Sequence, residues 1–314
     1  MSALVVGLGD VDPALVIPHL PANARFVPNP DAADLAAAAG AIVRADPLID
    51  ADLLAAMPAL RVLARTGVGT ERVDLEAASA RGIPVVVTPG SGSGAVAEGA
   101  IALTLALVKK LRAATDLVRE GRWAQRGTLD LGDLAGATMG ILGYGRIGRA
   151  TAHLAAAFGM RVLAHDPIAI IDDPATPATL DEVFASSDVI SLHLPLTPNT
   201  HHLVDAARLA ATKPGAVLVN CGRGGLIDLD AVHAALQSGR LAGVGLDVFD
   251  PEPPAHHPLF EHPDVVLTPH LMGLTRRATA LTFAAAAQGV TAVLEGGEPV
   301  AVANPDWIQH RPTR

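Results

Sequence analysis

Short apolar runs alternate with amphipathic, alanine- and leucine-rich segments along the first part of the chain. The runs have the length of buried strands, and the apolar positions of the longer segments repeat with helical spacing. In chain order, the predicted strands and helices lie at residues 3–6, 13–19, 41–43, 50–57, 61–64, 70–80 and 84–87. Strands that alternate with helices are typical of a parallel sheet with crossover helices, so we predict a first α/β domain here. A glycine- and serine-rich segment at residues 89–94 breaks the alternation like a hinge, and we place the domain boundary at residue 92.

A second alternating series begins near residue 137. Its predicted strands lie at residues 138–142, 161–165, 189–192, 216–220, 242–247 and 265–268. Six strands in this order, with helical segments between most of them, predict a doubly wound nucleotide-binding domain. The last predicted helix, near 274–294, leads to a tail that we expect to return to the first domain. The predicted division is therefore residues 93–286 against residues 1–92 completed by residues 287–314.

The segment at residues 94–120 is predicted to be one long helix with two apolar stripes. Such a helix needs cover on more than one side, which its own domain does not necessarily provide. We therefore infer that the helix contributes to a homodimer interface. Full burial within one chain explains the same pattern equally well, and the sequence alone does not separate the two interpretations.

Composition narrows the classes of function. Of the 314 residues, 50% are hydrophobic and 18% are charged, which suits two buried sheets and argues against disorder. The net charge of −9, without a basic cluster, argues against nucleic acid as a partner. The longest uncharged stretch of the last helix, residues 278–294, is short for a bilayer span, so no membrane partner is expected. A single cysteine, Cys221, argues against a disulfide or a thiolate metal site, so we expect no metal and a cytoplasmic location.

A glycine-rich turn follows the first strand of the second domain. Gly143, Gly145 and Gly148 let the turn tighten, let the backbone approach a pyrophosphate and let the next helix pack closely on the strand. The second strand ends at Asp166, where a carboxylate can accept hydrogen bonds from an adenine ribose. Asp166 also repels a 2′-phosphate, so the pattern favours NAD over NADP. The alternative interpretation is that the glycines serve only a tight turn.

Three loops that follow later strands of this domain carry an arginine, a glutamate and a histidine. Arg223, Glu252 and His270 each follow the carboxyl end of a strand, the edge at which open α/β sheets bind ligands. A guanidinium can hold a substrate carboxylate through two hydrogen bonds and polarise the adjacent carbonyl, which suits Arg223. Histidine titrates nearest to neutral pH, so His270 is the candidate donor of a proton to the alkoxide. Glu252 would fix the tautomer of the imidazole and favour its charged form.

With these motifs in place, the chain resembles the D-isomer-specific 2-hydroxyacid dehydrogenases, a family that includes phosphoglycerate, glycerate, formate and D-lactate dehydrogenases. The matching segments are LAGATMGILGYGRIG at 134–148, HLPLT at 193–197, VNCGRGG at 219–225, LDVFDPEP at 246–253 and TPHLMGLT at 268–275, with ARTGVG at 64–69 and VDL at 73–75. The resemblance implies an NAD-dependent enzyme that interconverts a 2-hydroxy acid and its 2-keto acid. It implies two doubly wound parallel-sheet domains, a Rossmann NAD-binding domain and a smaller flavodoxin-like substrate domain, with a cleft between them.

The resemblance also implies roles for individual residues. Arg223, Glu252 and His270 would be the catalytic residues, in agreement with the roles reached above. The residues that would line the NAD site, with Gly143, Gly145 and Gly148, are Arg146, Ile147, Asp166, Leu194, Pro195, Cys221, Asp247 and Gly273. Arg44, Val68 and Gly69, together with Arg223, would contact the substrate.

One segment departs from the family pattern, and two other functions remain open. Phosphoglycerate-type members usually carry an asparagine where this chain has only small residues at 89–93, so a substrate contact from that loop is in doubt. Hydroxypyruvate, glyoxylate and 3-phosphohydroxypyruvate are the candidate substrates, in no order. An NADH-binding regulatory protein that resembles the C-terminal-binding corepressors is the main alternative. Another Rossmann enzyme, such as a nucleoside hydrolase or a methyltransferase, would leave the three loops without a purpose.

Overall fold

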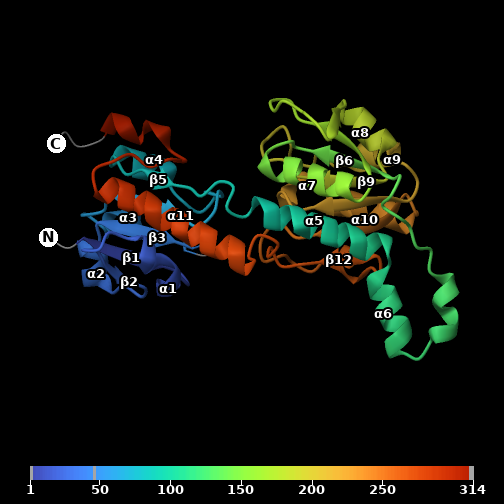
Figure 1. The fold of residues 1–314 in the computed structure, drawn as a ribbon, viewed down its shortest axis with the longest axis horizontal. Coiled ribbons are helices and arrows are strands. Elements are labelled where there is room, and N and C mark those ends of the chain that lie inside the picture. The colour runs from blue at the N-terminus through green and yellow to red at the C-terminus, as the bar shows by residue number, and fades with distance from the viewer. Residues whose placement is uncertain (1–2, 45–46, 311–314) are drawn as a thin grey trace. The chain divides into compact units, whose positions relative to one another are not determined.

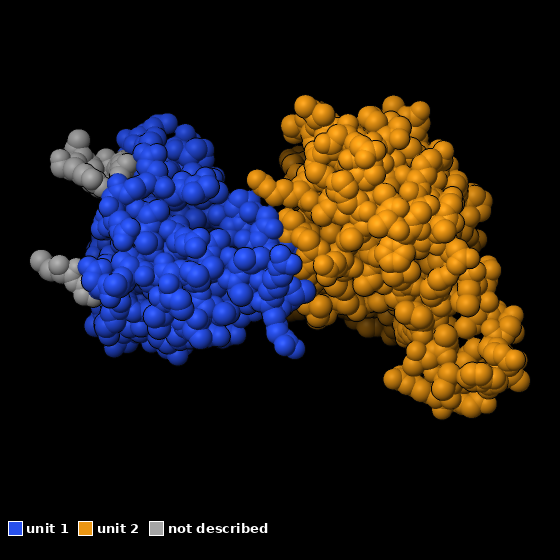
Figure 2. Space-filling model, in the orientation of Figure 1, with its two compact units in different colours: residues 1–92, 275–314 blue, residues 93–274 orange. Residues whose placement is uncertain are grey.

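The computed structural model describes residues 3–44 and 47–310. The chain forms two compact units, residues 1–92 with 275–314 (unit 1) and residues 93–274 (unit 2), which Figures 1 and 2 show. The first boundary coincides with the predicted one, whereas the chain returns to unit 1 at Thr275 and not at residue 287. The reason is helix α11 (Arg276–Leu294), whose buried residues from Phe283 to Val293 form one stripe in the core of unit 1. Such a helix cannot be divided between two units.

Unit 1 contains, in its described residues, a parallel five-stranded sheet of order β2-β1-β3-β4-β5. Its elements are β1 (Leu4–Leu8), α1 (Pro13–Val16), η1 (Ile17–His19), β2 (Arg25–Val27), α2 (Ala32–Ala37), β3 (Gly40–Val43), α3 (Ala51–Ala55), β4 (Val62–Arg65), α4 (Leu75–Ala80), β5 (Val85–Val86), α11 and η5 (Pro305–His310). Strand β2 and helix α2 were not predicted from the sequence, because both are short and neither has a buried residue. Aspartates cap four of the helices and fix where they begin; these are Asp12, Asp31, Asp50 and Asp74.

Unit 2, all of whose residues are described, is built on a parallel seven-stranded sheet of order β12-β11-β10-β9-β6-β7-β8. Its elements are α5 (Ser93–Val108), α6 (Leu111–Arg119), η2 (Trp123–Thr128), β6 (Thr138–Leu142), α7 (Arg146–Ala157), β7 (Arg161–His165), β8 (Ala175–Pro177), α8 (Leu180–Ser186), β9 (Val189–Leu192), α9 (Ala206–Ala211), β10 (Ala216–Asn220), η3 (Gly224–Leu226), α10 (Leu229–Gln237), β11 (Leu241–Leu246), η4 (Pro258–Glu261) and β12 (Val265–Leu267). The strand order reverses between β6 and β9, as in dinucleotide-binding sheets. The predicted six strands lack only β8, a short edge strand with two exposed residues.

Two apolar cores cover the two faces of the seven-stranded sheet. One core lies under α8, α9 and α10 and includes Phe184 and Leu236. The other lies under α5 and α7 and includes Leu103, Leu107 and Ala155. The doubly wound fold follows from this arrangement, because the central strands β6, β9 and β10 are buried along their whole length and read as nearly continuous apolar runs.

The predicted helix at 94–120 is two helices. Lys110 adopts a left-handed backbone conformation, with φ of 49°, and separates α5 from α6. Helix α5 is packed against α7 and the sheet within unit 2, so burial inside one chain accounts for its apolar residues. Helix α6 and η2 form an arm that extends from the rest of unit 2 (Figure 1).

Candidate active site

The three glycines of the turn after β6 differ in the space around them. Gly143 has φ of +93°, and a Cβ atom there would lie 2.7 Å from the carbonyl carbon of His193. A Cβ atom at Gly148 would collide with the carbonyl oxygen of Gly143, so that position requires close packing of helix on turn. A Cβ atom at Gly145 would meet nothing within 4 Å. The turn is therefore tight on its inner side and open at Gly145, which leaves room for a ligand to approach the backbone.

The first turn of α7 presents backbone donors at this opening. Gly145 is the N-cap residue and supplies no side chain to the first amides of the helix. Uncapped amides and the positive end of the helix dipole attract an anion such as a pyrophosphate. Arg146 is exposed and Ile147 is half-buried in this first turn.

Asp166, at the end of β7, is held in place by three backbone amides. Its Oδ2 atom accepts a hydrogen bond from Tyr144 N at 2.8 Å, and its Oδ1 atom accepts from Ile168 N and Ala169 N at 2.8 Å each. Burial raises the pKa of Asp166, but the three amide donors outweigh it and bring the pKa below its ordinary value. The carboxylate therefore stays charged, and it keeps acceptor capacity for ribose hydroxyls.

The remaining predicted cofactor residues lie on the loops after β9, β10 and β12. Leu194 is buried and Pro195 is exposed after β9, and Gly273 is half-buried after β12. Cys221 is buried at the end of β10, where burial, assisted by the charge of Asp247, raises the pKa of its thiol to about 12. The thiol is therefore protonated at neutral pH, which disfavours a nucleophilic role.

His193, which the sequence analysis did not single out, lies directly against the glycine turn. Its backbone limits Gly143, and its Nε2 atom lies 2.9 Å from Ser191 Oγ. Burial lowers the pKa of His193 to about 4, so this imidazole is neutral at pH 7. The motif HLPLT could have pointed to the residue, although nothing in the motif indicates that its backbone supports the turn.

Glu252 and His270 meet at the carboxyl edge of the seven-stranded sheet. His270 Nδ1 lies 2.8 Å from Glu252 Oε2, and Glu252 Oε1 accepts a hydrogen bond from Phe249 N at 3.0 Å. The two side chains are 51% and 37% exposed, so both reach solvent while they contact each other. A carboxylate on Nδ1 holds the imidazole with Nε2 facing outward, and such a pair can carry and deliver a proton.

A small cavity of about 350 Å³ lies beside this pair. It is lined by Phe249, Glu252, Pro253, Pro254, Leu267, Thr268, Pro269 and His270. Five of the eight lining residues are apolar, and Glu252 and His270 are the ionisable ones.

Arg223 follows β10, the strand next to β11 in the sheet. Its loop is shaped by Asn220, whose Nδ2 donates to Arg223 O at 2.9 Å and whose Oδ1 accepts from Gly222 N at 3.0 Å. A Cβ atom at Gly224 would collide with the backbone of Phe249, so the Arg223 loop lies directly against the loop that leads to Glu252. The structure thus brings the three predicted loops to one edge of the sheet.

Asp247, predicted as a cofactor residue, is also bonded to the loop that carries His270. Its Oδ1 atom accepts from Thr268 Oγ1 at 2.6 Å and from Leu271 N at 3.0 Å, and its Oδ2 atom accepts from Met272 N at 3.2 Å. These contacts were not visible in the sequence, because they join residues that lie more than twenty positions apart.

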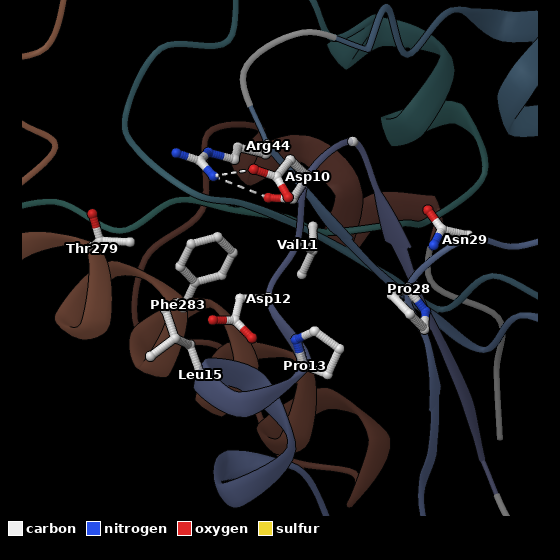
Figure 3. A pocket seen from close by; sticks show the side chains of 11 residues that line it. Asp10, Val11, Asp12, Pro13, Leu15, Pro28, Asn29, Arg44, Thr279 and Phe283 are labelled. Atoms are coloured by element: carbon white, nitrogen blue, oxygen red, sulfur yellow. Dashed lines mark hydrogen bonds and ion pairs between the residues drawn. The ribbon is translucent and has the colours of Figure 1, made fainter. Parts of the chain in front are cut away.

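The other predicted substrate residues, Arg44, Val68 and Gly69, lie in unit 1. Arg44 follows β3, and its Nη1 atom donates to the carboxylate and the carbonyl oxygen of Asp10, at 3.1 Å each. Both residues line a cavity of about 490 Å³ at the carboxyl ends of β1 and β3, with Asp12, Asn29 and Phe283 (Figure 3). The strand order of this sheet reverses there, which is where such sheets bind ligands.

Val68 and Gly69 lie on the loop after β4. Val68 is 57% exposed, and Gly69 O accepts a hydrogen bond from Arg65 Nε at 3.0 Å. Thr88 Oγ1 accepts from Gly67 N at 2.8 Å, so both sides of this loop are fixed. Val68 and Gly69 are therefore presented at the carboxyl edge of unit 1.

Two features of residues 3–44 and 47–310 bear on other classes of function. No group of three or more histidine, cysteine, aspartate or glutamate side chains is arranged to bind a metal ion in this part of the chain. Within the same residues, no helix has both the length and the apolar character needed to span a bilayer.

The strand order, the glycine turn and Asp166 define a doubly wound dinucleotide-binding domain. Comparison with known proteins makes the class specific: residues 101–272 match the family model described as the NAD binding domain of D-isomer specific 2-hydroxyacid dehydrogenases. The chain belongs to the D-isomer specific 2-hydroxyacid dehydrogenase family.

Similar proteins include two curated relatives. The chain is 42% identical over 283 residues to D-3-phosphoglycerate dehydrogenase of Mycobacterium tuberculosis, across 87% of this chain and 53% of that protein. It spans about half the length of that relative. It is 39% identical over 241 residues to hydroxypyruvate reductase of Thermotoga maritima, across 76% of this chain and 78% of that protein.

A solved structure resembles the whole chain. The NADPH-dependent glyoxylate/hydroxypyruvate reductase of Sinorhizobium meliloti has a TM-score of 0.84 and 32% sequence identity, with 99% of each chain covered. The fold of both units is therefore the fold of this family.

Proposed function

We propose that the chain is an NAD-dependent dehydrogenase that reduces a 2-keto acid to the D-2-hydroxy acid and catalyses the reverse oxidation. The observation that carries the proposal is the Glu252–His270 contact of 2.8 Å at the carboxyl edge of the dinucleotide-binding sheet. The residues that would hold the cofactor fit it, because Gly145 is open, the α7 amides are uncapped and Asp166 is a charged acceptor. When bound, NADH supplies the hydride that the reaction transfers to C2 of the substrate.

The chain's own residues account for the rest of the chemistry. Arg223 binds the substrate carboxylate through two hydrogen bonds and polarises the neighbouring keto group. His270, protonated and oriented by Glu252, donates the proton from Nε2 to the carbonyl oxygen as the C2–H bond forms. In the reverse direction the neutral imidazole removes the hydroxyl proton. Arg44, Val68 and Gly69 are proposed to contact the part of the substrate beyond its keto group, with hydroxypyruvate, glyoxylate and 3-phosphohydroxypyruvate as candidates.

The loss of NADH absorbance with a panel of these 2-keto acids tests the proposal. Turnover of at least one acid, with formation of the D enantiomer, is expected. Tight NADH binding without turnover of any acid would refute the proposal and favour the NADH-binding regulatory alternative, for which a search for protein partners is the next step.

The lone, buried Cys221 fits a reducing compartment, and we propose the cytoplasm as the location.

Asp166 is proposed to make the enzyme prefer NADH over NADPH. The carboxylate accepts from a ribose 2′-hydroxyl and repels a 2′-phosphate at the same position. Replacing Asp166 with serine removes the charge, so the ratio of kcat/KM for NADPH to that for NADH should rise at least about tenfold. Steady-state rates with both cofactors measure the ratio.

The matched control for this prediction is Asp230→Asn, an exposed carboxylate on α10 that contacts His257. The control should leave the cofactor ratio unchanged. Wild-type enzyme that uses NADPH as well as NADH, or a serine variant with an unaltered ratio, would show that Asp166 does not select the cofactor.

We propose that two copies associate through the arm formed by α6 and η2. The arm and the segment that follows it expose four large apolar side chains; these are Leu111 (52%), Val118 (61%) and Trp123 (63%) on the arm, and Leu131 (54%) after it. Because a second copy would cover them, Trp123→Glu should raise the dimer dissociation constant at least about a hundredfold. Sedimentation equilibrium measures that constant.

Ile308→Glu, which changes an apolar side chain that is 53% exposed on η5 of unit 1, is the control and should leave the dimer intact. A monomeric wild-type protein, or a Trp123 variant that stays dimeric, would rule out this arm as the interface.

A further inference from the structure

The loop of residues 268–273 holds His270 in a backbone conformation that residues other than glycine seldom adopt. His270 has φ of +50°, in the left-handed region, and its amide donates to Thr268 O at 3.0 Å. Residues other than glycine are uncommon there, and they stay there when surrounding contacts fix them. The structure should therefore contain contacts that hold this loop.

One such contact is electrostatic. Asp247 is buried and accepts hydrogen bonds from Thr268 on one side of His270 and from Leu271 N and Met272 N on the other. The backbone on both sides of the histidine is thereby bound to one carboxylate. Hydrogen bonds to a charged acceptor are the stronger kind.

The other contact is a fitted apolar one. Leu271 is 41% exposed, whereas the next side chain, Met272, packs against the core under α5. Met272 occupies the place where a side chain at Gly99 of α5 would stand, because a Cβ atom at Gly99 would lie 2.5 Å from Met272 Sδ and 2.7 Å from Met272 Cβ. The Cβ atom of Met272 moves only with its backbone, so the loop cannot keep its position if position 99 carries a side chain.

We propose that Gly99 and Met272 are positioning residues for His270: the recess at Gly99 seats Met272, and with Asp247 this contact sets the direction of the imidazole toward the substrate. The inference rests on the proposed function, in which His270 is the proton donor. Neither residue needs to touch substrate for this role, because each acts through the loop.

The test exchanges the glycine between the two positions. Gly99→Ala forces Met272 and its loop to move, and a displacement of about 1 Å at a reacting group can reduce a rate a hundredfold. We expect kcat to fall between about tenfold and a hundredfold, with KM for NADH within about twofold of wild type. Met272→Gly alone should lower kcat only a few-fold. The kcat of the double variant Gly99→Ala/Met272→Gly should return to within about threefold of that of Met272→Gly, because the effects of substitutions at two contacting residues are not additive.

Gly94→Ala, on the same helix, is the matched control, since a Cβ atom there would meet nothing within 4 Å. It should keep wild-type rates. The split between kcat and the KM for NADH separates positioning from general destabilisation, because a displaced loop affects the chemical step and leaves the glycine turn and Asp166 in place. Equal kcat for Gly99→Ala and Gly94→Ala would overturn the proposal.

Hydrogen exchange gives a readout that does not depend on turnover. The amides of Leu271 and Met272, both bonded to Asp247, should exchange faster in Gly99→Ala, and the double variant should restore their protection. Unchanged amide exchange in Gly99→Ala would show that the recess at Gly99 does not hold the loop through Met272, even if the enzyme is active. Altered exchange in a protein that turns over no keto acid would refute the proposed function and leave the loop contact established. If Gly99→Ala does not fold, Met272→Gly decides: wild-type amide exchange and wild-type rates in that variant would overturn the proposal.

Discussion

Replacing His270 with alanine is expected to lower kcat for keto-acid reduction by about 10²- to 10⁴-fold, the usual contribution of a positioned general acid. The loss should fall on the chemical step, because the side chain contacts Glu252 and no part of the glycine turn or Asp166. The dissociation constant of NADH, measured by fluorescence titration, should therefore stay within about threefold of wild type. Glu252→Gln, which keeps the shape of the pair but removes its charge, should cause a smaller loss of about ten- to a hundredfold.

The chain offers a close control for this experiment. His256 and Glu261 form a second histidine–glutamate contact, 2.9 Å between Nε2 and Oε1, with both side chains about three-quarters exposed. His256→Ala removes an imidazole–carboxylate pair that lies outside the proposed site, and its kcat should match that of wild type. If His270→Ala retained wild-type kcat, or if both histidine variants lost activity equally, His270 would not be the proton donor.

Much of the fold could be predicted because the buried parallel strands are nearly continuous runs of apolar residues in the sequence. The predicted strands at 138–142, 161–165, 189–192 and 216–220 coincide with β6, β7, β9 and β10. The strands that were missed, β2 and β8, have three residues each at sheet edges, and only one of the six residues is buried. A run that short shows no periodicity by which the sequence distinguishes it from a loop.

Some features of the helices depend on tertiary packing and do not show in the local sequence pattern. The apolar positions at 94–120 continue past Lys110, so nothing in their spacing marked the left-handed residue that separates α5 from α6. Helix α11 has the expected length, but which unit it covers depends on the partner sheet that its stripe fits. Both features are decided by packing against residues far away in the chain.

The candidate site also has a part that could be predicted from the sequence and a part that could not. Arg223, Glu252 and His270 could be proposed from sequence because each follows a strand end and because their chemistry is complementary, and the structure brings Glu252 and His270 into contact. Their roles remain predictions. The contacts of Asp247 with residues 268–272 and the seat of Met272 at Gly99 could not be proposed, since they join positions about 21 to 25 and 173 apart whose pairing depends on the folded sheet.

Arg223→Lys is expected to lower kcat/KM for the keto acid by about a hundredfold or more, although the positive charge is kept. A guanidinium offers two parallel donors to a carboxylate and remains in line with the adjacent keto oxygen, whereas an ammonium is a single point charge on a flexible stem. The loss should appear both as a higher KM, from the weaker hold on the carboxylate, and as a lower kcat, from the weaker polarisation of the carbonyl. Steady-state kinetics with the keto acid that is turned over best measures both KM and kcat.

Arg208→Lys on α9 is the conservative control, because Arg208 contacts only Leu203 O and Asp205 in the hydrogen bonds it donates and lies outside the proposed site. Its kinetic constants should equal those of wild type. A lysine at position 223 that changes neither KM nor kcat would mean that the substrate carboxylate is bound elsewhere. The guanidinium of Arg44 would then be the next candidate, and its own variant would show whether the acid is held from unit 1. If instead Arg223→Lys raises KM alone, Arg223 binds the carboxylate equally in ground and transition states, and the polarising role falls to His270 by itself.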